Sequence, residues 1–151
     1  MYTLVRRYIK TAVGFLATGL LLGLWMLVRR ELWQRFPTPY ETSAHTHALL
    51  VGFVMMMILG VALWLFPRPD KADARYRPLL AELAYWMLAT GTAGRVVGEL
   101  SRAAVPERWM GWVIILCGTL QLGGIGVFFH TMWGRIRPVG SAQREARGER
   151  F

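Results

Sequence analysis

Three histidines are the residues of this sequence best suited to bind a metal ion or a cofactor. His45 and His47 stand two positions apart, and His130 lies far along the chain. An imidazole nitrogen is a common ligand for iron, copper and zinc. Residues two apart on an α-helix point about 200° apart around its axis. We therefore expect one histidine to face the interior and the other to face lipid or a neighbour, so that the two do not chelate one ion together.

A stripe of residues follows His45 at helical spacing and includes Gly52 and Met56. The missing side chain at Gly52 would leave room in which a flat macrocycle could lie beside the histidine. The alternative is that Gly52 serves close packing of helices, which is the commoner use of glycine in membranes. The alternative to ligand binding by His45 and His47 is that both are hydrated residues at the membrane surface.

Four apolar stretches must position these residues, and each is long enough to cross a bilayer, which takes roughly 20 residues. Hydrophobic residues make up 54% of the 151 residues. The sequence predicts an all-α fold, an integral membrane four-helix bundle over residues 1–134, followed by a basic and disordered tail over 135–151. The expected helices cover residues 8–28, 43–66, 79–100 and 109–133.

The net charge of +9 reflects basic residues at the ends of the apolar stretches. This distribution is typical of membrane flanks and does not predict a nucleic-acid surface. Twelve of the 18 Lys and Arg residues fall in the N-terminus, the middle connection and the tail. Since positive residues accumulate on the cytoplasmic side, both termini are expected in the cytoplasm. We expect the protein to lie in the cytoplasmic membrane of a bacterium or archaeon.

The segment RFPTPYETSAHTHALLVGFVMMMILGVALWLFPRP resembles the second helix of the catalytic subunits of haem-copper oxidases and nitric oxide reductases. In that family a His-Thr pair opens the helix, and apolar residues with glycines and a proline beside a charged residue follow. His45 corresponds to the haem-ligating histidine and Thr46 to the threonine after it. Where relatives often have Asn, this chain has His47. The resemblance implies a b-type haem on His45, with His47 as the alternate ligand.

The rest of the chain departs from that family, whose subunits have about twelve helices and further histidines for a second haem and a copper or iron ion. The similarity covers about 35 of the 151 residues. The expectation is therefore a small four-helix relative that does not carry out proton-pumping oxygen reduction. No Cys-x-x-Cys-His motif is present, so the haem is expected to be non-covalent.

The second axial ligand is left open by the sequence. His130 is expected at the opposite membrane face from His45, about 30 Å away by helix rise. We interpret it first as a residue of the membrane surface and, with lower priority, as the ligand of a second haem. The iron would then be five-coordinate, or it would take His47, Met110 or a side chain of another subunit as its sixth ligand. An open site suits a diatomic gas.

Arg95 and Arg102 are the cations expected to pair with the haem propionates, because the guanidinium fork binds carboxylates. For Arg95 the alternative partner is Glu99, four residues further along the helix. Gln121 stands in the middle of the fourth stretch and is expected to form a hydrogen bond to another helix.

The expected function is that of a membrane haem protein that binds, senses or detoxifies a diatomic gas, with nitric oxide favoured, or transfers one electron. Whether it is an enzyme stays open. The alternative is an accessory or scaffold subunit that packs against a respiratory membrane complex through its glycine seams and has no cofactor of its own. The Gly-x-x-x-Gly spacings at Gly19–Gly23 and Gly94–Gly98 would pack helices within the chain or join a homo-oligomer. Handling of a quinone or metal ion is a third possibility.

Overall fold

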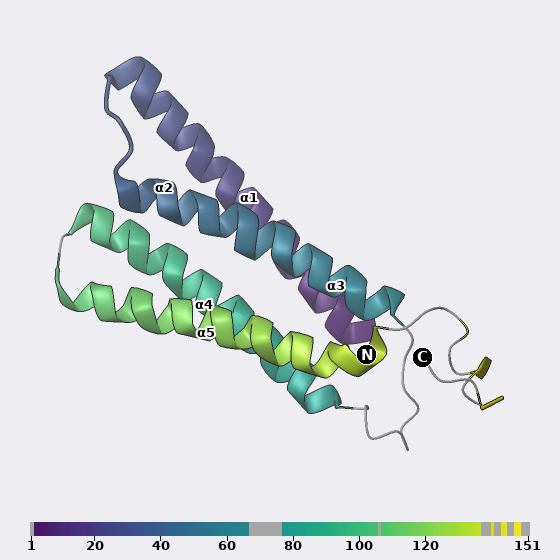
Figure 1. The fold of residues 1–151 in the computed structure, drawn as a ribbon. Helices are drawn as coiled ribbons and strands as arrows, with labels where there is room; N and C mark the ends of the chain where they lie inside the picture. The colour runs from purple at the N-terminus through teal and green to yellow at the C-terminus, as the bar shows by residue number, and fades with distance from the viewer. Residues whose placement is uncertain are drawn as a thin grey trace.

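Four long helical runs form the part of the chain that the computed structural model describes, which is residues 2–66, 77–105 and 107–136 with positions 140, 143–144 and 147–148. The runs lie side by side (Figure 1). The elements are α1 (Tyr2–Trp33), α2 (Pro39–Thr46), the π-helical η1 (His47–Met55), α3 (Met56–Leu65), α4 (Pro78–Ala104), α5 (Trp109–Met132) and the 3₁₀ turn η2 (Trp133–Arg135). The predicted all-α class and the four predicted helices are confirmed.

The second run begins at residue 39, four residues before the expected start, because a capping box precedes it. The Glu41 amide donates to the Thr38 hydroxyl (3.2 Å), and the Thr38 amide donates to the Glu41 carboxylate (2.7 Å). Pro39 occupies the first turn, where its missing N–H costs nothing. Glu41 also pairs with Arg29 of α1. The cap thus fixes the start of the helix that carries both histidines.

Hydrogen bonding within this run changes from α to π geometry at His47, and α geometry resumes at Met56. The sequence predicted an α-helix throughout. Short π segments occur often at functional sites. Nothing in the residues of η1 accounts for the change, but it places the two histidines on either side of a boundary in backbone geometry.

The core of the bundle lies toward the end where α1 begins and α5 ends. Tyr8, Leu88 and Phe128 are almost fully buried there. The Tyr8 ring lies edge-on to Tyr85 (5.0 Å between centroids) and to Phe128 (6.0 Å). These contacts hold α1, α4 and α5 together at that end. We call the other end, where α1 ends and α5 begins, the distal end.

Both glycine seams are used inside the chain. Gly19 and Gly23 lie against side chains of the second helical run, and a Cβ on either would come within 3 Å of them. Gly94 and Gly98 lie against α5, where a Cβ would come 2.7 Å from Cys117 Sγ and 3.2 Å from Ile114 Cγ1, respectively. The interpretation as packing within one chain is therefore confirmed, and these seams are not available to a second subunit.

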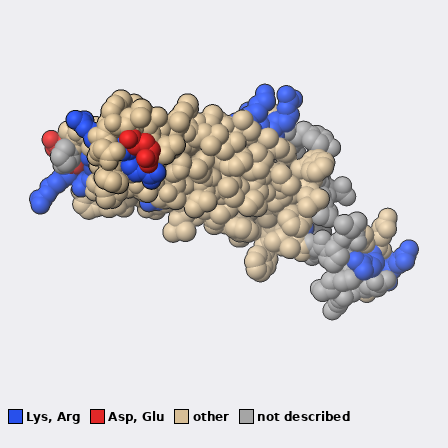
Figure 2. Space-filling view, turned by 90° about the horizontal axis from the view of Figure 1, so that it is seen from above, with Lys and Arg blue, Asp and Glu red and all other residues tan. Residues whose placement is uncertain are grey.

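Three of the helical runs are long and apolar enough to cross a membrane: Thr3–Trp33, Pro39–Leu65 and Trp109–Arg135. Figure 2 shows the charged side chains at the two ends of the molecule, with an uncharged band between them. The run α4 was expected to be the remaining span, but it is less apolar because it carries Glu82, Arg95 and Glu99. It is nevertheless the helix with most buried residues among those described. The whole is consistent with a membrane protein.

The start of α1 and the end of α5 lie at the same end of the bundle (Figure 1). Arg135, predicted as the first residue of the tail, is buried and belongs to the folded part. Its guanidinium donates to the carbonyls of Leu63 (3.4 Å) and Phe66 (3.2 Å), which lie at the C-terminal end of α3. Most of the expected disordered tail, and residues 67–76 of the middle connection, lie outside the described residues.

Replacement of Gly91 by alanine should destabilise the bundle, because a Cβ there would lie 2.8 Å from the Cys117 carbonyl oxygen on the backbone of α5. Overpacking of this kind costs about 1–3 kcal/mol. We expect Gly91→Ala to lower the apparent melting temperature of the detergent-solubilised protein by several degrees. Gly126→Ala is the control, since among the described atoms none lies within 4 Å of its Cβ position. Equal melting of the two variants would contradict this packing.

Candidate functional site

His45 faces α1 at the distal end of the bundle. Its Nδ1 atom lies 2.9 Å from the carbonyl oxygen of Gly19. A carbonyl oxygen accepts and does not donate, so Nδ1 carries the hydrogen and, in the neutral ring, Nε2 keeps its lone pair. The ring edge lies against Gly23, where a Cβ would come within 2.8 Å of Cε1. The first glycine seam is therefore what allows the imidazole to sit against α1.

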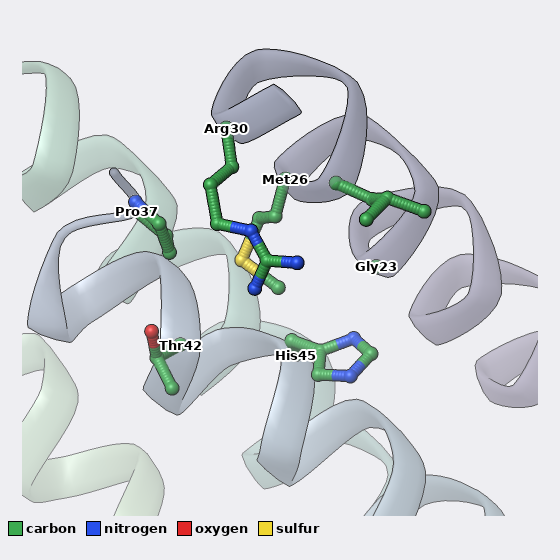
Figure 3. A pocket seen from close by; sticks show the side chains of 7 residues that line it. Gly23, Met26, Arg30, Pro37, Thr42 and His45 are labelled. Carbon is green, nitrogen blue, oxygen red and sulfur yellow. The ribbon is translucent and has the colours of Figure 1, made fainter. Parts of the chain in front are cut away.

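A cleft of about 390 Å³ opens beside this ring, between α1 and the start of α2. This volume falls in the range of roughly 300–1,000 Å³ that is usual for small-molecule and cofactor sites. Figure 3 shows the side chains of Met26 and Arg30 reaching into the cleft from α1. The helices α1 and α2 diverge here (Figure 1). The cleft is lined by Gly23, Met26, Leu27, Arg30, Pro37, Thr42 and His45.

His47 faces α4 instead. Its Nδ1 atom lies 2.8 Å from the Ser43 carbonyl oxygen and 3.6 Å from Oε2 of Glu99. The two histidines thus face different neighbours, as their spacing predicted. Both neighbours are helices of the same chain, and the exposed residue between them is Thr46. The structure therefore supplies an acidic group beside His47 that the sequence did not reveal.

Glu99 is the centre of a buried polar network that joins α2, α4 and α5. Its side chain is 3% exposed. Oε1 accepts hydrogen bonds from the Ser43 hydroxyl (2.8 Å) and from Arg95 Nε (3.0 Å). Arg95 also donates to the side-chain oxygen Oε1 of Gln121 (3.2 Å), and the side-chain nitrogen Nε2 of Gln121 donates to the Thr92 hydroxyl (3.1 Å). The expected Arg95–Glu99 pair and the expected interhelical bond of Gln121 are both confirmed.

Neither predicted propionate partner lies in the cleft beside His45. Arg95 belongs to the network of Glu99. Arg102 donates to the Tyr40 hydroxyl (2.8 Å) and to the Glu107 carbonyl oxygen (3.2 Å), and its guanidinium lies 5.2 Å from the Tyr40 ring centre. The structure thus uses both guanidinium groups to join segments of the protein.

The space expected beside Gly52 is filled by the side chain of Phe15 from α1. A Cβ on Gly52 would lie 2.4 Å from Phe15 Cγ. Met56, one turn further along, is fully buried in the core. The packing interpretation of Gly52 is therefore confirmed, and no room for a macrocycle is present at that level.

His130 lies at the end of the bundle away from His45, as expected. Its Nε2 atom is 2.9 Å from a guanidinium nitrogen of Arg77 at the start of α4. Among residues 2–66, 77–105 and 107–136, no group of three or more His, Cys, Asp or Glu side chains is placed to hold a metal ion. Met110, the weak candidate for a sixth ligand, does not line the cleft.

The sequence reasoning missed the contribution of α1 to the site. Gly23, Met26, Leu27 and Arg30 follow the spacing i, i+3, i+4 and i+7, which places them on one face of a helix. The signal was present, but Arg30 was interpreted as a membrane flank. The segment opposite His45 could not be identified without knowing which helix packs there.

Together these features define a helical protein of membrane type with a histidine beside an interhelical cleft. The chain belongs to the family described as Domain of unknown function (DUF8744), which matches residues 3–122. That match includes the cleft and the network of Glu99. Neither a curated protein nor a solved structure matches the chain.

Removal of one partner of the Arg95–Glu99 pair should destabilise the protein more than removal of both. Glu99→Leu leaves a guanidinium without its carboxylate, and we expect a loss of about 2–3 kcal/mol, since Arg95 is partly exposed. The double variant Arg95→Met/Glu99→Leu should recover at least half of that loss. Thermal unfolding in detergent measures both. Additive losses would show that the two side chains are not coupled.

Proposed function

We propose that this chain is a membrane protein with four spanning helices and cytoplasmic termini, and that it holds a non-covalent b-type haem through Nε2 of His45. The observation that carries the proposal is the position of the His45 ring at the cleft. Its Nδ1 atom is held by the Gly19 carbonyl oxygen, which leaves Nε2 as the ligand atom. A hydrogen bond from the other ring nitrogen to a carbonyl is the usual way in which a ligating histidine is oriented.

The lining of the cleft suits a haem. Its walls are mostly apolar, from Gly23, Met26, Leu27 and Pro37, as a macrocycle requires. Arg30 is the charged residue among those that line the cleft. A bound haem would supply reversible gas binding or one-electron transfer at its iron. The part of the expected site around Gly52 does not contribute, since Phe15 occupies that space.

The proposed function is the binding, sensing or detoxification of a diatomic gas, nitric oxide first, or the transfer of one electron. His47 is turned toward Glu99 on α4. It is therefore not placed to be a second ligand in the cleft beside His45. Met26 also lines the cleft, and its thioether would be the second residue there able to hold a haem iron; if it did not, the iron would be open to a gas.

An absorption spectrum of the protein purified from haem-replete cells tests the proposal. We expect a Soret band in the wild type, its loss in His45→Ala, and its retention in His47→Ala, because His47 faces α4. A Soret band that shifts when carbon monoxide or nitric oxide is added to the reduced protein would assign gas binding. Sharp reduced bands that ignore both gases would assign electron transfer. A colourless wild type, or loss of the band in His47→Ala alone, would overturn the assignment to His45.

The packing of both glycine seams inside the chain weakens the alternative, an accessory subunit without a cofactor. It was expected to dock through its glycine seams, and both seams are filled within the chain. A colourless protein that co-purifies with a larger respiratory complex would favour it.

A further inference from the structure

We infer that Arg30 on α1 binds a carboxylate of the haem, in the place that the sequence predicted for Arg95 or Arg102. This inference rests on the proposed function, because it names the group that orients the ligand of the same cleft. Haem is an apolar macrocycle with two carboxylates on one edge. A cleft that holds a haem needs an imidazole for the iron at the centre of the ring and a cation for the carboxylates at its edge.

The face of α1 that lines the cleft provides this order. Gly23 lies against the His45 ring, Met26 and Leu27 follow, and Arg30 comes last. The seven residues from Gly23 to Arg30 correspond to about 10 Å along the helix axis. A macrocycle with its iron at His45 would therefore have its carboxylate edge toward the distal end, at the level of Arg30.

Three of the other described guanidinium groups near this end have partners that take them away from the cleft. Arg29 pairs with Glu41, and Arg95 pairs with the buried Glu99. Arg102 lies over Tyr40. Among the residues that line the cleft, Arg30 alone carries a fixed positive charge.

Arg30 is available to a ligand even though it has a neighbour. Its Nε atom donates to Glu31 (2.7 Å), in an ion pair whose side chains are 51% and 58% exposed. Exposed pairs of this kind contribute little. The two terminal nitrogens of the guanidinium make no other hydrogen bond within the described chain. Figure 3 shows the Arg30 side chain alongside Met26, with its guanidinium directed into the cleft that His45 also lines.

The inference is tested with two probes, ferric haem b and its dimethyl ester, which lacks both negative charges. Each is titrated into detergent-solubilised apoprotein and followed at the Soret band. The variants are Arg30→Gln and the control Arg35→Gln, an exposed arginine at the same end. We expect Arg30→Gln to weaken haem binding about tenfold, which is the loss of one charge-assisted hydrogen bond.

The ester separates this contact from a general loss of structure. Wild type and Arg35→Gln should bind the ester about tenfold more weakly than haem, whereas Arg30→Gln should bind the two alike. If Arg30→Gln still prefers haem by the wild-type factor, the inference is wrong while the haem site on His45 stands. If the wild type binds neither probe, the proposed function fails and this inference with it.

Discussion

The buried carboxylate of Glu99 is the constraint on which the arrangement of the helices depends. Inside a bilayer a backbone or side-chain polar group must find its partners within the protein. Oε1 of Glu99 finds them in Ser43 of α2 and Arg95 of α4, and Arg95 connects in turn to Gln121 of α5. Oε2 is buried with no hydrogen bond to the described residues and lies 3.6 Å from His47 Nδ1. Three helices are therefore held at the distal end by one chain of hydrogen bonds. The same carboxylate lies beside His47, so it also determines which histidine remains beside α1.

The helix α4 carries charged residues and is also the helix with most buried residues among those described. It is the run whose composition falls short of a membrane span, yet it supplies Thr92 and Glu99 to the interior. Two of the charged residues that lower its hydropathy, Arg95 and Glu99, are bonded to each other inside the protein, so they need not contact lipid, whereas Glu82 pairs with Arg7 at the surface. The apolar helices around it provide the outer surface, and close packing through Gly91 and Gly94 brings the backbone of α5 near enough for the network to form.

The sequence was sufficient to predict where the helices lie along the chain, but it was insufficient to predict which residues of different helices contact each other. Apolar stretches of membrane length predicted four helices, and the i, i+4 spacing predicted the pairing of Arg95 with Glu99. The partner of a residue on another helix is not encoded in local spacing. For this reason the sequence could not show that Phe15 fills the space beside Gly52, or that Arg30 reaches the cleft. The capping box of Thr38 and Glu41 is visible in the sequence and marks the start of α2 at Pro39. The predicted start was later because it was placed at the first apolar residues, and the first turn of α2 is polar.

A ligand beside His45 can lie in one direction only, because α1 packs against the second helical run on one side of His45 and diverges from it on the other. The stripe that follows His45 does face one partner along its length, since Leu49 meets Gly19 and Gly52 meets Phe15. That partner is α1, so on the core side of His45 the second helical run is covered by α1 and has no space for a ligand. On the other side the two helices diverge, and the open volume lies between Met26 and Thr42. Whatever binds beside His45 must therefore enter and lie toward the distal end. The closed core and the open distal cleft are two consequences of the same helix. It packs tightly through its glycines and then diverges from α2, to which it stays joined by the Arg29–Glu41 pair.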